Sequence, residues 1–326
     1  MTAPITPRAT MVVYRPMREA REDEISQGQS PRRKRRRPRV WPVSVENGDL
    51  CGLVRGIVDA SAGRGEGGYV TPLPGEASSF GVLAGAMGGG DLRGARRLAA
   101  ALGYALVLYD DVVTGRQLLV ACDASEPGRG WDAILVDPEG DDVLVEVAHP
   151  GSDLRTTEVG VAVFRETRAR ALLVAGAHRY AWKDARCDAA RAPDTPFDLA
   201  HRALLPARCV IQPHGFHRED GDYPAIVLSA GAAPPPPGLA AVRRGFEEAG
   251  FEAGLWEGGD RYRSLAATKN RQGTSSGRPG GCSSTSRSPE SSGKTGTSAD
   301  GWRRCWRGRS GHGRVADVHS IARRRC

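Results

Sequence analysis

Short apolar runs rich in Val, Ile and Leu recur along the chain from about residue 100 onward, and Gly, Asp and Pro separate them. Runs of about 4–8 such residues between turn signals are typical of β-strands. The sequence therefore predicts strands at residues 105–109, 117–123, 131–137, 143–149, 171–178, 209–216, 225–231 and 251–256.

Segments of helical character lie between the later strands. In the segment 156–168, for example, Val159, Val163 and Phe164 fall on one helix face. The two other predicted helices span residues 197–205 and 238–249. Strands that alternate with helices need crossover connections, so we predict an α/β fold with a mixed, largely parallel sheet and helices on both faces.

This alternation of strands and helices is confined to residues 96–273, which we interpret as one α/β hydrolase-like domain. Residues 1–95, with the basic run Arg32–Arg39, are predicted to be mostly disordered or irregular. Residues 274–326 contain 11 Ser, 9 Gly and 10 Arg but no Leu or Phe, so they are predicted to be a disordered tail. Because GC-rich DNA read out of frame also yields this mixture, a frameshift after Gly273 and a natural tail both stay open.

Charge and cysteine content narrow the class of protein. Residues 41–273 carry 24 Lys and Arg against 31 Asp and Glu, so the domain is acidic and the overall charge of +8 comes from the two ends. No aromatic residues interleave the basic run, and we expect no nucleic-acid partner. The chain has no apolar run of membrane length and no signal-like start, which favours a soluble, cytoplasmic protein without membrane contact. Its seven scattered Cys include no CxxC pair and favour reduced thiols.

Three of the seven histidines, His149, His178 and His214, follow predicted strands. Ligands of α/β sheets bind at such strand ends. Asp153 lies four residues after His149. Two imidazoles and a carboxylate form the ligand set of a catalytic zinc with an open fourth position, so His149, Asp153 and His214 are the candidate zinc ligands. The alternative is that these side chains only form hydrogen bonds in polar loops. His178 is a candidate ligand, an outer hydrogen-bond partner or a substrate contact, or else an ordinary polar strand end.

The order of the motifs HPGSD, LLVAGAHR, VIQPHGF, AIVLSAG and TKNRQG over residues 143–273 resembles the poly-γ-glutamate hydrolases. These are zinc-dependent amidohydrolases with a carboxypeptidase-like fold. The resemblance implies that His149 and His214 match the two zinc histidines and that Asp153 replaces the glutamate ligand. The acid of that family comes one residue later, so Glu158, which aligns with a second acid of the loop, is a competing ligand.

The resemblance also implies substrate contacts and a missing group. His178, Asn270 and Arg271 match positions that bind the substrate, a small-molecule or peptide-like carboxylate. The family's catalytic glutamate follows the Asn segment, but here the chain enters its Ser- and Arg-rich tail, which leaves Glu158 as the nearest alternative base. Two functions follow as expectations. One is a zinc-dependent amidohydrolase or peptidase that cuts an amide bond next to a carboxylate and is inactive if the base is lacking; the other is a non-catalytic α/β module that binds a metal or small molecule.

Overall fold

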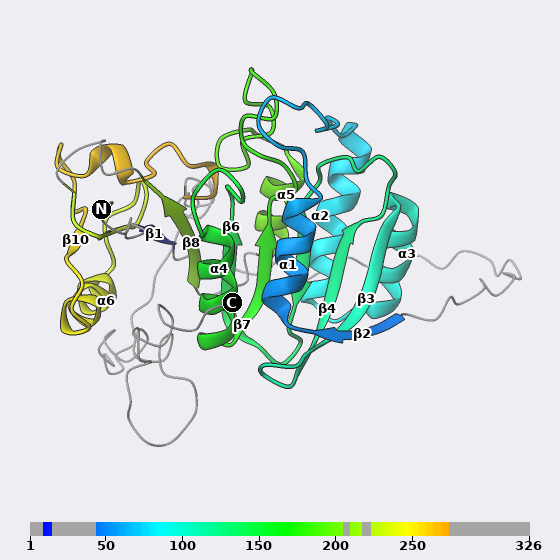
Figure 1. The fold of residues 1–326 in the computed structure, drawn as a ribbon, viewed down its shortest axis with the longest axis horizontal. Coiled ribbons are helices and arrows are strands. Elements are labelled where there is room, and N and C mark those ends of the chain that lie inside the picture. Colours follow the sequence, from blue (N-terminus) through cyan, green and yellow to red (C-terminus); the bar gives the residue numbers. More distant parts are fainter. Residues whose placement is uncertain (1–8, 15–43, 205–208, 217–222, 274–326) are drawn as a thin grey trace, which may run out of the picture.

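The computed structural model describes residues 9–14, 44–204, 209–216 and 223–273, and its strands form one sheet with helices on both faces (Figure 1). The strands are β1 (Ala9–Tyr14), β2 (Ser44–Gly48), β3 (Tyr104–Asp111), β4 (Arg116–Asp123), β5 (Ala133–Val136), β6 (Asp141–Val147), β7 (Ala169–Val174), β8 (Cys209–Gly215), β9 (Ile226–Ser229) and β10 (Ala253–Leu255). The helices are α1 (Leu50–Asp59), α2 (Pro74–Gly88), α3 (Leu92–Leu102), α4 (Thr156–Glu166), α5 (Pro196–Leu204), α6 (Pro237–Glu248) and the short 3-10 helix η2 (Arg263–Leu265).

The order of strands across the sheet is β10-β9-β1-β8-β6-β7-β5-β4-β3-β2. Of the nine pairings between described strands, five are parallel and four are antiparallel. The parallel strands β8, β6 and β7 lie together near the middle, and α4 and α5 belong to the connections between them. The predicted α/β class and mixed sheet are thus confirmed, with parallel pairings in a small majority.

Two apolar cores hold the helices on the sheet. One contains buried residues of α2, α3 and α5, and the other contains buried residues of α1, α4 and α6. Strand β5 supplies both cores in alternation, because Ile134 and Val136 join the first while Ala133 and Leu135 join the second. Burial on both faces explains why this strand is a continuous apolar run rather than an alternating one.

The structure differs from the sequence prediction in the first part of the chain. Strands β1 and β2, helices α1 and α2 and the first turn of α3 lie in residues 1–95, where the sequence predicts mostly irregular structure. Glycines of α2 let this helix pack closely against α5. A Cβ atom added at Gly81 would lie 3.3 Å from the Cβ of Leu199, and one at Gly88 would lie 2.9 Å from a methyl group of Leu204. The glycines therefore serve helix packing, which outweighs their low helix propensity.

Within residues 96–273, each strand and helix predicted from the sequence is present, with ends shifted by a few residues. Residues 1–8, 15–43 and 274–326 lie outside the described residues, so the basic N-terminal arm and the disordered or frameshifted tail stay predictions. None of the helices in the described part of the chain is long and apolar enough to span a membrane.

Candidate metal centre

Two neighbouring parallel strands, β6 and β8, bring the predicted ligands together. Because the strands run in the same direction, their carboxyl ends meet at one edge of the sheet. His214 is the penultimate residue of β8, and His149 lies two residues beyond the end of β6. The chain then turns back, because the backbone N–H of Asp153 donates to the carbonyl of His149 at 3.0 Å and Gly151 adopts a φ of 72°. Strand ends and turn thus place three side chains at the same point.

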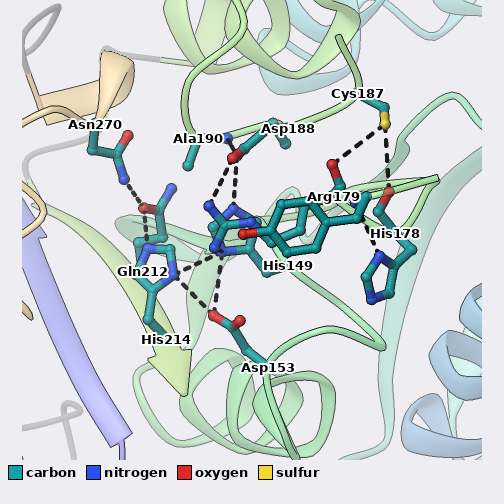
Figure 2. A network of polar contacts seen from close by, with 12 residues as sticks. His149, Asp153, His178, Arg179, Cys187, Asp188, Ala190, Gln212, His214 and Asn270 are labelled. Atoms are coloured by element: carbon teal, nitrogen blue, oxygen red, sulfur yellow. Dashed lines mark hydrogen bonds and ion pairs between the residues drawn. The ribbon is translucent and has the colours of Figure 1, made fainter. Parts of the chain in front are cut away.

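Three side-chain atoms form a small triangle at this edge (Figure 2). His149 Nδ1 lies 3.2 Å from Asp153 Oδ2 and 3.1 Å from His214 Nδ1, and His214 Nδ1 lies 3.2 Å from the same Asp153 oxygen. All three side chains are largely buried, with exposed fractions of 3%, 10% and 13% for His149, Asp153 and His214. Among the described residues, this is the group of His, Cys, Asp and Glu side chains whose atoms lie close enough to share a metal ion.

The second nitrogen of each imidazole faces an oxygen. His149 Nε2 lies 2.9 Å from Asp188 Oδ1, and the other Asp188 oxygen accepts a hydrogen bond from Arg179 at 2.7 Å. His214 Nε2 lies 2.7 Å from the Gln212 Oε1 atom. Carboxylate and amide oxygens only accept hydrogen bonds, so both Nε2 atoms bear a proton. In the neutral rings both Nδ1 atoms then present a lone pair to the triangle, the arrangement seen when an outer partner orients a metal-binding histidine.

The triangle therefore holds three acceptors. The Gly215 N–H donates to Asp153 Oδ2 at 3.2 Å and Arg179 Nη1 lies 3.4 Å from His149 Nδ1, and a cation between the three acceptors would balance the rest. Tetrahedral ligands at about 2.0–2.2 Å from zinc are about 3.3–3.6 Å from one another. The three separations of 3.1–3.2 Å between His149, Asp153 and His214 are only slightly shorter. The donor set and its spacing fit a divalent metal.

A proton on one of the histidines is the alternative to a metal ion in this cluster. Burial lowers the pKa of His214. Burial also acts to lower the pKa of His149, but hydrogen bonds with Asp153 and Asp188 outweigh it and raise that pKa. Burial acts to raise the pKa of Asp153, yet its contacts with the two histidines hold the pKa well below the ordinary value. A protonated His149 and a bound metal are thus the two ways to neutralise the triangle.

A cavity of about 540 Å³ lies in front of the triangle. Four cationic side chains line it, namely Arg179, Arg191, Arg263 and Lys269, whereas Asp153 is the only carboxylate among its lining residues. The cavity is therefore positive although the predicted domain as a whole is acidic. Such a local field favours anionic ligands.

The segment Arg263–Asn270 follows the last described strand and forms one wall of the cavity. Hydrogen bonds on both sides fix this wall. Ser229 Oγ donates to the carbonyl of Ala266 at 2.8 Å, and Gln272 Nε2 donates to the carbonyl of Ala189 at 2.9 Å. The wall therefore reaches from the edge of the sheet back to the loop before α5.

The structure separates the two polar residues of the TKNRQG motif. Asn270 lines the cavity and its Nδ2 donates to Gln212 Oε1 (Figure 2). The side chain of Arg271 is 44% exposed, lies 4.0 Å from the Asp198 carboxylate and does not line the cavity. Asn270 thus lies where a substrate contact is expected, whereas Arg271 lies to one side.

The other two candidate residues also lie away from the triangle. The His178 ring accepts a hydrogen bond from the backbone N–H of Tyr180 at 3.0 Å and is not among the residues lining the described cavity. Glu158 lies on α4 and pairs with Arg55 of α1 at 2.7 Å. Its engagement there does not favour a role as metal ligand or base.

Sequence reasoning missed the partners that orient the ligands. Gln212 lies two residues before His214 on the same strand, so both side chains point to the same face, and this spacing was available as a signal. Asp188 and Arg179 lie in an irregular connection between β7 and α5, where no periodicity places them. Sequence spacing can thus identify residues on a strand or in the short turn that follows it, but not those in a long irregular connection.

Comparisons of the chain with protein-family models, with curated proteins and with solved structures found no match. Function is therefore inferred from the geometry of the site and from the short motifs.

Proposed function

We propose that the protein binds a divalent metal, zinc, through His149, Asp153 and His214, and that it acts as a hydrolase on an amide bond next to a carboxylate. The observation behind this proposal is the triangle of three acceptors 3.1–3.2 Å apart, whose imidazoles are oriented from behind by Asp188 and Gln212. A cluster that served only to form hydrogen bonds would pair donors with acceptors.

Zinc is the metal favoured by the donor set. Two imidazole nitrogens and one carboxylate oxygen suit zinc, while magnesium and calcium prefer oxygen donors alone. Three protein ligands would leave one position on the ion for water or substrate, and a zinc ion held by them would supply Lewis-acid activation of water and of a carbonyl group. A carboxypeptidase-like amidohydrolase, as the motif order suggests, is the proposed class.

The cationic cavity supports a substrate with a carboxylate. Arg191, Arg263 and Lys269 surround the space in front of the proposed metal, and Arg179 is held beside it by Asp188. Arg179 also has a buried Nε–H without a hydrogen-bond partner in the described part of the chain. A substrate carboxylate would satisfy such donors, since guanidinium groups bind carboxylates through paired hydrogen bonds. This chemistry suits γ-glutamyl and N-acyl amino-acid substrates.

A second candidate function, metal-dependent binding without turnover, follows from a specific observation. Asp153 is the only carboxylate among the residues lining the described cavity, and it belongs to the triangle. Hydrolysis by an activated water needs a group that moves a proton, and its absence costs about 10²–10⁴ in rate. The binding function would keep the metal and the cationic cavity and lose only catalysis.

One experiment separates the two functions. The purified full chain is titrated with zinc, and release of amino acid from γ-glutamyl and N-acyl amino-acid substrates is followed with and without zinc. Zinc-dependent turnover that disappears in His214→Ala supports the hydrolase. One equivalent of bound zinc without turnover supports the binding function. Failure to bind zinc at micromolar concentration would refute both.

A further inference from the structure

A chain of buried polar side chains leads from the metal centre into the core. Glu146 of β6 and Gln212 of β8 are both fully buried, at 0% exposure. Gln212 Nε2 donates to Glu146 Oε2 at 3.2 Å, while Gln212 Oε1 lies 2.7 Å from His214 Nε2, as Figure 2 shows for the latter pair. On the far side, Glu146 Oε1 lies 2.7 Å from Nδ1 of His201 on α5. Glu146 therefore connects helix α5 to a metal ligand through one amide.

The charge on Glu146 dictates the orientation of this amide. A carboxylate only accepts hydrogen bonds, so the NH₂ group of Gln212 has to face it, and the carbonyl oxygen has to face His214. The reversed amide would set two oxygens against each other in a buried site, where an unsatisfied polar group destabilises the folded state. Gln212 Oε1, in turn, can only accept, which keeps the His214 proton on Nε2.

Asn270, on the cavity side, favours the same orientation of the Gln212 amide. Its Oδ1 accepts a hydrogen bond from the backbone N–H of Gln272 at 3.1 Å, so its NH₂ group points to Gln212 Oε1. Hydrogen bonds from the cavity wall and from the core thus favour the same orientation of the Gln212 amide. Networks in which each member has its partner hold such arrangements most strongly.

We propose that Glu146 is a positioning residue of the metal centre, which fixes the Gln212 amide and thereby directs the Nδ1 lone pair of His214 toward Asp153. The inference rests on the metal site proposed above. Glu146 itself is neither one of the three donors nor a residue that lines the cavity. A neutral side chain at this position would fill the space but would leave Asn270 as the one described group that still selects this amide orientation.

The test compares zinc affinity and histidine protonation in matched variants of the full chain. Glu146→Gln should weaken zinc binding about 10–100-fold, the usual cost of losing an outer partner of a metal ligand. Nitrogen-15 NMR of the rings should show the His214 proton on Nε2 in the wild type and distributed over both nitrogens in the variant. Asp111→Asn, which alters another buried acid that pairs with Arg165, is the control and should leave the zinc affinity unchanged.

A charge swap provides the rescue. Gln212→Glu alone would face Glu146 with a second carboxylate and should lose zinc affinity. The double variant Glu146→Gln/Gln212→Glu moves the charge next to His214, where it still accepts the Nε2 proton, and should regain affinity to within about threefold of wild type. The double variant also serves as the test if Glu146→Gln does not fold.

Three results would overturn the inference. They are an unchanged zinc affinity and an unchanged His214 proton position in Glu146→Gln, an equal loss of affinity in Asp111→Asn, and a double variant that folds without regaining affinity. If the wild type bound no zinc, the proposed function would fail, and the position of the His214 proton in wild type and Glu146→Gln would still decide the role of Glu146.

Discussion

Two buried carboxylates of this protein, Asp111 and Asp153, lie in polar clusters with opposite balances of donors and acceptors. Around Asp111, at the end of β3, two nitrogens of Arg165 donate at 3.0 and 2.6 Å, the Thr114 hydroxyl donates at 2.6 Å, and the backbone N–H of Leu50 donates at 3.3 Å. Around Asp153, the backbone N–H of Gly215 donates at 3.2 Å, and the nearest side-chain atoms are two imidazole nitrogens whose rings place their protons elsewhere.

The difference distinguishes a structural cluster from a ligand site. The Asp111 carboxylate has as many donors as it can accommodate, so the folded chain satisfies it alone. The Asp153 cluster holds more acceptors than donors, and the folded chain leaves it dependent on a proton or a metal ion. Counting donors and acceptors therefore separates the two clusters, although both carboxylates are largely buried, with exposed fractions of 1% for Asp111 and 10% for Asp153.

The largest expected effect is on zinc binding. His214→Ala removes one of three ligands and should weaken zinc binding by more than about 100-fold, the upper cost of losing only an outer partner. Asp111→Asn should bind zinc like the wild type. Competition titration against a chromogenic chelator measures both. Equal affinity of His214→Ala and wild type would place the metal elsewhere.

For stability we expect the reverse order, with the larger effect in Asp111→Asn and the smaller in His214→Ala. Asp111→Asn leaves Arg165 with a weakened partner and should lower the free energy of unfolding by about 3 kcal/mol, as for other broken buried pairs. Urea denaturation of the metal-free proteins measures this, with His214→Ala as the comparison. A loss below about 1 kcal/mol would mean that Asp49, the other partner of Arg165, suffices.

The stability that Asp111 contributes should depend on pH. Burial acts to raise the pKa of Asp111, but hydrogen bonds from Arg165 and Thr114 outweigh it and hold the pKa below its ordinary value. A lowered folded-state pKa contributes stability that is present above the unfolded pKa of about 3.9 and is lost as the pH falls through the folded value. The difference in stability between wild type and Asp111→Asn should therefore shrink below about pH 4.

Zinc should stabilise the folded chain by a slightly smaller amount. At free zinc 100 times the dissociation constant, linkage predicts about 2.7 kcal/mol. Asp111→Asn should show the same increment on top of its lower baseline, and His214→Ala should show less than about 0.4 kcal/mol at that concentration. Thermal melts with zinc and with a chelator provide the measurement. An equal increment in all three proteins would indicate non-specific binding.

The smallest effect concerns the cavity cations. Lys269→Ala should weaken the binding of an anionic competitor such as N-acetylglutamate about 3–10-fold, because one partly screened charge contributes about 1 kcal/mol. Zinc affinity should not change, and added salt should reduce the difference. Calorimetric titration of the zinc-loaded protein measures it. An increase in affinity in Lys269→Ala would contradict an anionic ligand.

The sequence predicts the sheet well and the site in part, for physical reasons. Runs such as residues 133–136 are buried on both faces, so hydrophobic pattern alone identifies them. The meeting of His149 and His214 at one edge of the sheet was predictable because parallel strands place their ends together. Asp188 was not predictable, since its position depends on an irregular loop with no periodic signal. Helix α2 was missed because glycine has a low helix propensity. The close packing against α5 that its glycines allow is visible only in the folded chain.

The hydrogen-bonded wall Arg263–Asn270 lies apart in sequence from the loops that hold the metal triangle. In the proposed function, the metal donors come from the ends of β6 and β8, whereas this wall supplies much of the surface that meets the ligand, and Asn270 links the two through Gln212. A chain cut after β10 would keep all three donors and lose Arg263, Lys269 and Asn270 together. Exchange of this one segment is thus a route by which the same metal site could acquire a different ligand preference, in nature or in the laboratory.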